Sequence, residues 1–334
     1  MCVLAVFKMV IGFPRNGEFK QVYILLFFCA TLFVINHLYP SYLTNNSSGG
    51  LHANNHLSKE LPCRDSDGPS FWASGLAAGT DKVSKAFNTV LWKGEKFPTH
   101  TFQFAYEKYL RPRRCQQLRL LEIGLGCGFS PWKMGSSVLL WLHFLPNALV
   151  SSFEFNKECA TAFRTNFPFP LDAQKRSRFQ EMFIGDQSNP ADFEQLDRFA
   201  PYDVIIDDGG HSMRMQITSL EELMPRVAPG GIYILEDLET SFSSAGSWPD
   251  YLDGPGGLTT MVYVTNLIMA ITSPKHIETL DPRFAGLRRL VSLIKSVDCF
   301  REICVFTRFA DGEWPVAEAP LFPEGIYSFP RLPK

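Results

Sequence analysis

The sequence predicts an α/β fold in which buried parallel strands alternate with helices. Two short apolar runs support this prediction, at residues 204–206 and 232–235, and acidic residues follow each run directly. The stretch between them is long enough for a helix, from residue 211 to about 227, and a Pro-Gly-Gly turn. A helix between two strands is the usual parallel crossover. A third run, 119–123, leads into a glycine-rich turn that lets the backbone approach a ligand closely.

The acidic residues that follow two of these runs are expected to lie side by side. Asp207 and Asp208 precede two glycines and His211, and Glu236 and Asp237 follow the second run. The carboxyl ends of neighbouring parallel strands meet at one edge of the sheet, where ligands bind. Because carboxylate oxygens suit Mg²⁺, Ca²⁺ and Mn²⁺, these strand ends predict one metal site with three ligands: Asp208, Glu236 and Asp237.

A simpler alternative is that Asp208 only caps the helix that begins near His211. Against it, the four acidic residues converge without basic partners in the sequence pattern. They would repel one another unless a cation or a proton intervened. Both interpretations stay open at this point.

The composition describes an ordinary globular protein. The chain has 334 residues, of which 46% are hydrophobic and 20% charged, enough for one large domain or two small ones. The formal net charge is −2, and there is no basic tract and no internal repeat. These features argue against a nucleic-acid-binding protein.

The N-terminal region predicts a membrane segment. Residues 22–35 form an uncharged apolar run that extends to about residue 39, close to the length that a bilayer requires. Basic residues precede the run, and none follows until Lys59, so we expect a cytosolic tail at 1–20 and a transmembrane signal anchor at 21–39. The body would then lie across the membrane, in the ER or Golgi lumen. A cleaved signal peptide and a cytosol-facing body are the alternatives.

Residues 40–70 are rich in Ser, Asn and Gly and predict a flexible stalk. Overlapping glycosylation acceptors begin at Asn45 and Asn46, usable only on a luminal side.

Six cysteines lie beyond the apolar run. Of these, Cys299 and Cys304 lie in an expected hairpin. There they either form a disulfide or stay unpaired and pack as two small apolar residues.

The glycine-rich turn has the spacing G-x-G-x-G and contains Gly124, Gly126 and Gly128. Phe129 stands where a dinucleotide-binding turn has its third glycine, so nicotinamide binding is disfavoured. Glu122, just before the turn, fits instead the acidic-x-Gly-x-Gly-x-Gly pattern of enzymes that use S-adenosylmethionine (SAM).

The next two strands are expected to add further cofactor contacts. Glu154 ends the strand at 148–156 and is suited to ribose hydroxyls. Asp186 and Gln187 follow the third strand and suit an adenine amino group. Any one of these residues could be a solvated loop residue, but three strand ends in succession weaken that interpretation.

The chain resembles metal-dependent SAM O-methyltransferases that modify the sugars of macrolide and related antibiotics, and uncharacterised fungal proteins with the same motifs. The resemblance spans roughly residues 75–308, and the pairing of IDDGxH with ED is its most specific part. It rests on GTDK at 79–82, His100, Tyr106-Glu107, LLEIGLGCG, Gly135-Ser136-Ser137 with Trp141, GDQ, IIDDGGH and LEDLETS.

This resemblance implies a doubly wound, Rossmann-like sheet of seven mainly parallel strands, over residues 71–312. It also implies Mg²⁺ or Mn²⁺ on Asp208, Glu236 and Asp237, with His211 as the general base and Asp207 nearer SAM. Ser137 is implied as a further cofactor contact. The segment after the glycine turn is longer than in the antibiotic enzymes, and Asn156 stands where an Asp is common.

The expected function is therefore metal-assisted methyl transfer from SAM to a hydroxyl of a sugar, glycoside or related small molecule. A divalent ion lowers the pKa of a bound hydroxyl, and a histidine, with an ordinary pKa of about 6.5, accepts its proton. The loop at 243–257 is expected to shape the acceptor pocket, and 313–334 forms a proline-rich tail. The alternatives are a phenolic or polyketide acceptor, and a catalytically silent membrane-anchored scaffold.

Overall fold

The computed structural model describes residues 63–313, except 65, 67, 85–89, 93–94, 98–99, 129–133, 169, 243–251, 274–275 and 277–280. Of the residues before 62, it describes only the backbone of two strands, β1 (Val6–Ile11) and β2 (Lys20–Leu25), which pair antiparallel. The chain divides into two compact units, 1–61 and 62–334. Most of the predicted stalk, most of the loop at 243–257 and the tail beyond 313 lie outside the described residues.

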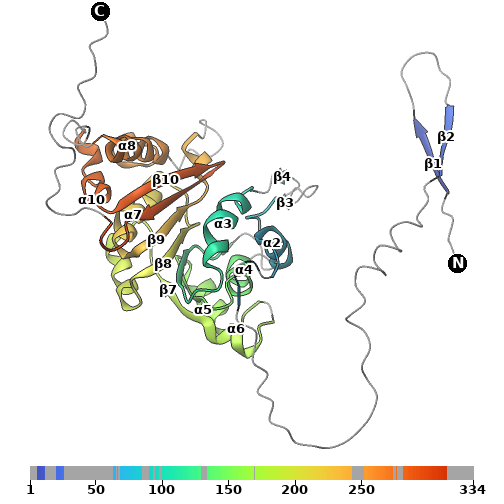
Figure 1. Ribbon diagram of the computed structural model, residues 1–334, viewed down its shortest axis with the longest axis horizontal. Coiled ribbons are helices and arrows are strands. Elements are labelled where there is room, and N and C mark those ends of the chain that lie inside the picture. The colour runs from blue at the N-terminus through green and yellow to red at the C-terminus, as the bar shows by residue number, and fades with distance from the viewer. Residues whose placement is uncertain are drawn as a thin grey trace, which may run out of the picture. The chain divides into compact units, whose positions relative to one another are not determined.

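The larger unit is built on one seven-stranded sheet with the order β10-β11-β9-β8-β5-β6-β7 (Figure 1). Strands β5, β6, β7, β8 and β9 pair in parallel, whereas β11 runs antiparallel to β9 and β10. The predicted seven-stranded, mainly parallel fold is therefore confirmed. The strand bounds are β5 Arg119–Ile123, β6 Leu149–Glu154, β7 Phe179–Ile184, β8 Tyr202–Asp207, β9 Val227–Leu235, β10 Ile294–Phe300 and β11 Ile303–Arg308. A short hairpin pairs β3 (Val90–Trp92) with β4 (Glu95–Phe97).

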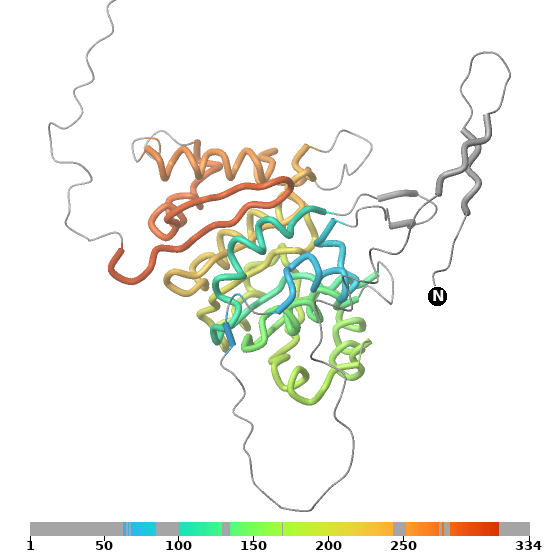
Figure 2. The backbone as a smooth tube through the Cα atoms, turned by 45° about the vertical axis from the view of Figure 1, so that its right-hand side comes forward, coloured from blue at the N-terminus to red at the C-terminus, as the bar shows by residue number. Residues whose placement is uncertain are grey.

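Helices cover both faces of the sheet (Figure 2). Successive strand residues point to opposite faces, so Leu120 joins one hydrophobic cluster and Leu121 the other. The first cluster includes residues of α2, α3 and α4, and the second includes residues of α7, α8 and α10. The helix bounds are α2 Phe71–Ala78, α3 Gln103–Leu110, α4 Ser136–Phe144, α5 Lys157–Thr165, α6 Ala173–Arg178, α7 Met213–Leu223, α8 Thr260–Thr272 and α10 Leu287–Val291.

The position of the ligand-binding edge follows from the strand order. The chain runs from β5 outwards through β6 to β7, and then returns to β8 on the other side of β5. In doubly wound sheets, ligands bind at the carboxyl ends of the strands where the order reverses in this way. The turns that follow β5, β8 and β9 are therefore brought to one place.

Ser212 caps helix α7, because its side chain accepts a hydrogen bond from the Met215 backbone N–H. The interpretation of Asp208 as the cap of this helix is therefore wrong. The carboxylate of Asp208 is left for other partners.

Three disulfides join all six cysteines of the larger unit: Cys63–Cys115, Cys127–Cys159 and Cys299–Cys304. The last pair faces across the β10–β11 hairpin, so the disulfide alternative is confirmed there. The other two pairs are separated by 52 and 32 residues and had no signal in the local sequence.

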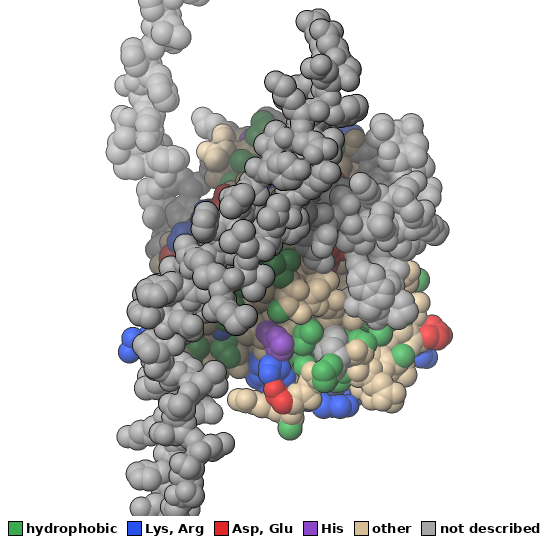
Figure 3. All heavy atoms as spheres, turned by 90° about the vertical axis from the view of Figure 1, so that its right-hand side faces the viewer, with side chains coloured by type: hydrophobic (Ala, Val, Ile, Leu, Met, Phe, Trp, Pro, Cys, Tyr) green, Lys and Arg blue, Asp and Glu red, His purple; other side chains and the backbone are tan. Residues whose placement is uncertain are grey.

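On the face shown in Figure 3, charged side chains of both signs are scattered among apolar ones wherever the surface is described.

None of the helices in the described part of the chain is both long and apolar enough to cross a bilayer. The predicted anchor at 21–39 lies outside the described residues except where it overlaps β2. In that overlap the backbone forms a strand and not the start of a helix.

Candidate active site

The turns after β5 and β8 are in direct contact. Gly124 has φ = 92°, and a Cβ added there would lie 2.1 Å from the Asp208 carbonyl oxygen. The backbone N–H of Asp208 in turn donates to the Ile123 carbonyl oxygen at 3.1 Å. Only glycine therefore fits at position 124, and its presence holds the glycine-rich turn against the acidic turn.

Glu122 lies at the end of β5 with its side chain fully buried. Ser137, in the first turn of α4, donates a hydrogen bond to Glu122 Oε2 at 2.8 Å. Burial raises the pKa of Glu122 to about 7, although the nearby Lys82 ammonium acts in the opposite direction. The structure thus brings together two of the predicted cofactor residues.

Glu154 fixes the glycine-rich turn from the neighbouring strand. Its Oε2 accepts from the Leu125 backbone N–H at 2.9 Å, and its Oε1 accepts from the Asn156 N–H at 2.8 Å. Asp186 accepts from the Ser188 backbone and hydroxyl. The ribose and adenine contacts of these two acids stay predictions.

Gln187 and Asp207 belong to one buried network. The Gln187 amide donates to Asp207 Oδ1 and to Ser219 Oγ, both at 2.7 Å, and its oxygen accepts from the Gly210 N–H at 2.8 Å. Tyr233 donates to Asp207 Oδ2 at 2.6 Å. Burial raises the pKa of Asp207 to about 6. The amide hydrogens of Gln187 are therefore used within the protein, and its amide oxygen supports the turn at Gly210.

The expectation that the acidic residues converge without a basic partner is wrong. Lys82, from the GTDK segment after α2, is buried, and its Nζ lies 2.5 Å from Asp208 Oδ2 and in contact with Glu236 Oε2. Tyr106 of α3 donates to the other oxygen of Glu236. The local sequence of GTDK gave no sign of this pairing, because Lys82 and Glu236 are 154 residues apart.

Asp208, His211 and Asp237 form the first of two clusters in the described part of the chain that could bind a metal ion, with their ligand atoms all within 4.8 Å of one another. His211 Nε2 lies 3.2 Å from Asp237 Oδ2. Both His211 and Asp237 have φ = 57°. Residues other than glycine rarely adopt this backbone conformation, and those that do are often found at functional sites. The predicted proximity of these three residues is thus seen directly.

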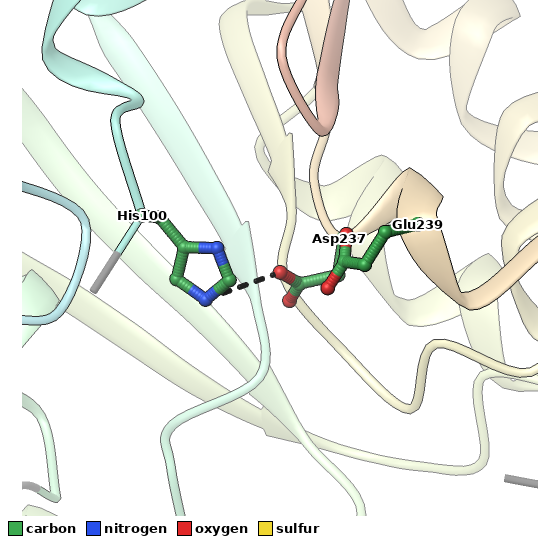
Figure 4. Close-up of side chains that lie close together, drawn as sticks. All are labelled: His100, Asp237 and Glu239. Carbon is green, nitrogen blue, oxygen red and sulfur yellow. Dashed lines mark ion pairs between the residues drawn. The ribbon is translucent and has the colours of Figure 1, made fainter. Parts of the chain in front are cut away.

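His100, Asp237 and Glu239 form the second cluster, on the other side of the Asp237 carboxylate (Figure 4). His100 Nε2 lies 3.5 Å from Asp237 Oδ1, and its Nδ1 lies 3.1 Å from Glu302 Oε2. Burial opposes protonation of His100, but the carboxylates around it, led by Asp237, raise its pKa above the usual value. Asp237 therefore stands between two histidines.

The donor set fits a divalent ion. Asp237 Oδ1 is buried and accepts no hydrogen bond among the described residues; His100 Nε2 faces it at 3.5 Å, too far for a normal hydrogen bond, so the oxygen can still accept a cation. The carboxylates of Asp208 and Asp237, from the turns after β8 and β9, lie close enough together to bind one such ion. Glu236 lies next to this set, but its oxygens accept hydrogen bonds from Lys82 and Tyr106.

An apolar pocket of about 200 Å³ lies beside the second cluster. It includes Glu239 of that cluster and Glu302, which pairs with His100, and the Cys299–Cys304 disulfide contributes to its wall. Its apolar lining comes from Leu238, Phe242, Met261 and Phe300. The pocket therefore offers an apolar surface close to the carboxylates that could hold a metal.

Comparison with known proteins finds antibiotic-sugar O-methyltransferases. The chain is 32% identical over 180 residues to 8-demethyl-8-alpha-L-rhamnosyl tetracenomycin-C 2'-O-methyltransferase of Streptomyces olivaceus, covering 52% of this chain and 42% of that protein. It is 32% identical over 178 residues to demethylmacrocin O-methyltransferase of Streptomyces fradiae, covering 51% and 39%. The chain thus spans less than half the length of these curated relatives. No family model matches it.

Among solved structures, the chain is similar to the MycE methyltransferase of the mycinamycin biosynthetic pathway, which was crystallised with Mg and SAH. The TM-score is 0.53 at 23% sequence identity, covering 77% of this chain and 58% of MycE. A second MycE structure, with mycinamycin VI also bound, gives a TM-score of 0.52. This likeness confirms the fold. In sequence and fold, the chain is similar to O-methyltransferases that act on antibiotic sugars.

Proposed function

We propose that this protein is a SAM-dependent O-methyltransferase that methylates a hydroxyl of a sugar, glycoside or related small molecule with the help of Mg²⁺ or Mn²⁺. The observation that carries the proposal is the convergence of Asp208, His211 and Asp237 beside the glycine-rich turn. The contact between Gly124 and the Asp208 carbonyl brings the proposed cofactor turn next to the proposed metal ligands. The similarity to curated sugar O-methyltransferases supports the same function.

The proposed cofactor site is formed by Glu122, Ser137, Glu154, Asp186 and the turn of three glycines. Glu122 and Glu154 place acidic groups on two sides of the turn, and Glu154 also fixes the turn through the Leu125 N–H. Gln187 and Asp207 act behind this site, through the network that supports Gly210. These residues would orient the methyl donor towards the edge at which β8 and β9 end.

The proposed metal ligands are Asp208, Asp237 and Glu236. When bound, the divalent ion would supply Lewis acidity that lowers the pKa of an acceptor hydroxyl. His211 accepts the hydroxyl proton as the oxygen bonds to the methyl carbon and the carbon–sulfur bond breaks, which leaves a neutral thioether. Asp237 Oδ2, 3.2 Å from His211 Nε2, then stabilises the imidazolium. The pocket beside Glu239 is where we place the acceptor's apolar part.

Titration calorimetry of SAM and of Mg²⁺ into the full chain tests this function. We expect both SAM and Mg²⁺ to bind to the wild-type protein. The variants Asp208→Asn and Glu236→Gln should each weaken Mg²⁺ binding at least tenfold, with little change in SAM affinity. Asp298→Asn, on strand β10 and paired with Lys108, is the matched control and should bind Mg²⁺ normally. A folded wild-type protein that binds neither SAM nor Mg²⁺ would exclude the enzyme and leave the anchored scaffold.

Activity assays then address the acceptor and the base. Methyl transfer from SAM should be detected with a panel of glycosides and not with catechols. His211→Gln should lower kcat by about 10²- to 10⁴-fold, the usual contribution of a general base, at unchanged SAM affinity. Transfer to catechols alone would contradict the sugar assignment.

We also propose that the larger unit lies in the lumen of the ER or Golgi. Three disulfides among the six cysteines of that unit support an oxidising compartment. Expression in a eukaryotic cell checks this. A luminal unit should carry glycans near Asn45 that an endoglycosidase removes, and Asn45→Gln with Asn46→Gln should abolish the mobility shift. A protein that lacks glycans and has reduced cysteines would contradict luminal placement.

A further inference from the structure

Lys82 occupies the junction of the proposed cofactor and metal sites. Its side chain is 2% exposed, and its Nζ lies 2.5 Å from Asp208 Oδ2, in contact with Glu236 Oε2, and 3.9 Å from Glu122 Oε1. An ammonium has three hydrogens to donate and is costly to bury unless it is paired. Here Asp208, Glu236 and Glu122 supply that pairing, because their carboxylates surround the buried Nζ.

Two of these three carboxylates are the proposed ligands of the divalent ion. A carboxylate that accepts a hydrogen bond from an ammonium is a weaker ligand for a metal ion than a free carboxylate, because the ammonium already neutralises part of its charge. Two cations a few ångströms apart in a buried site also repel each other strongly. Lys82 and a divalent ion therefore place conflicting demands on Asp208 and Glu236.

We propose that Lys82 is an internal counter-cation that holds Asp208 and Glu236 together without metal and competes with the divalent ion for them. Glu122 provides a place to which the ammonium can move. Its Oε1 is buried and lies 3.9 Å from Nζ, and by geometry it accepts no hydrogen bond within the described part of the chain, although the Trp141 side chain is close enough to favour the ionised carboxylate. Lys82 is thus a positioning residue that sets the metal affinity, and this inference rests on the proposed function.

The test is the Mg²⁺ affinity of the full chain, measured by calorimetry without SAM, for the wild type, Lys82→Met and Lys82→Gln. Both variants remove the charge, and Gln keeps an amide donor. We expect each to bind Mg²⁺ at least tenfold more tightly than the wild type. In a chelator, both should have a lower Tm than the wild type, and saturating Mg²⁺ should raise their Tm by more than it raises that of the wild type.

Lys108→Met is the matched control, because it also removes a lysine that pairs with an aspartate, but at the surface. It should leave Mg²⁺ affinity unchanged. If both Lys82 variants fail to fold in chelator, recovery of folded protein on refolding with Mg²⁺ supports the inference, and failure to recover overturns it. Unchanged or weaker Mg²⁺ binding by folded variants overturns it while the methyltransferase proposal stands. A folded wild type that binds no Mg²⁺ overturns both.

Discussion

Glu122 is a buried carboxylate whose ionisation works against folding. Its pKa is about 7 in the folded protein and 4.5 in an ordinary environment. Between these values the unfolded chain releases the proton and the folded chain keeps it. The free energy of unfolding therefore falls as the pH rises through this window, by on the order of 3 kcal/mol in total.

Glu122→Gln should remove this pH dependence, because the amide does not ionise and can still accept the Ser137 hydrogen bond. We expect the variant to gain stability relative to the wild type at pH 8, and to gain much less at pH 5. Urea unfolding at the two pH values measures the difference. A gain of equal size at both would show that Glu122 is ionised in the folded protein throughout.

A turn can require glycine for two reasons, a positive φ or a lack of space for a Cβ, and Gly124 and Gly128 differ in the second. Both have positive φ, 92° and 88°. A Cβ at position 124 would lie 2.1 Å from the Asp208 carbonyl oxygen, whereas a Cβ at position 128 would have no neighbour within 4 Å among the residues that the structure describes. An alanine at either site carries a backbone cost of about 1–2 kcal/mol, but only at 124 does it also force two turns apart.

We therefore expect Gly128→Ala to lower the free energy of unfolding by about 1 kcal/mol and Gly124→Ala by about 3 kcal/mol or more. Gly124→Ala should also weaken binding of both SAM and Mg²⁺, because the two proposed sites share this contact. Urea unfolding and calorimetry measure these effects. Equal losses in the two variants would mean that the turns after β5 and β8 can separate at little cost.

At the scale of elements, a disulfide joins the glycine-rich turn to helix α5. Cys127 lies between Gly126 and Gly128, and Cys159 lies within α5, which follows β6. The Cys63–Cys115 disulfide joins the segment before α2 to the residues just after α3, away from that turn. The two bridges close loops of comparable length, so their loss should destabilise the protein similarly, by about 2–4 kcal/mol each.

The double variant Cys127→Ser with Cys159→Ser should bind SAM at least tenfold more weakly, because the turn loses its covalent link to α5. Cys63→Ser with Cys115→Ser should lose comparable stability but keep its SAM affinity. Calorimetry at a temperature well below both Tm values makes the comparison. Equal SAM affinity in the two double variants would show that the Cys127–Cys159 bridge stabilises the fold without positioning the turn.

The strands were the part of the fold that the sequence pattern predicted best. The run at 119–123 has the bounds of β5, and the runs at 204–206 and 232–235 lie within β8 and β9. The carboxylates at the ends of β8 and β9 followed from the parallel crossover. Each of these features depends on neighbours within a few residues, or on one strand–helix–strand unit.

The features that the sequence did not predict all depend on long-range contacts. Lys82 reaches Asp208 across 126 residues of chain, and no local pattern marks a lysine that will be buried among carboxylates. Six cysteines allow fifteen pairings, so neither Cys63–Cys115 nor Cys127–Cys159 could be chosen. The network role of Gln187 likewise needs Ser219 and Gly210 in place. Chain topology determines all three.

At the scale of the whole molecule, the larger unit contains what a domain needs for independent folding. Both hydrophobic clusters lie within residues 63–313, as do all three disulfides. Removal of residues 1–61 should therefore leave the Tm within about 2 °C of that of the full chain, with unchanged SAM and Mg²⁺ affinities. Scanning calorimetry of both proteins in the same detergent-containing buffer measures this.

A slightly longer deletion, of residues 1–70, is the matched control. It removes Cys63, which leaves Cys115 unpaired, and Ser70, whose side chain caps α2 by accepting from the Ala73 N–H. Loss of one disulfide and one helix cap should together lower the free energy of unfolding by about 3–5 kcal/mol and the Tm by about 10 °C. If the shorter deletion lowers the Tm as much as the longer one, residues 1–61 are part of the folded domain, and independent folding is excluded.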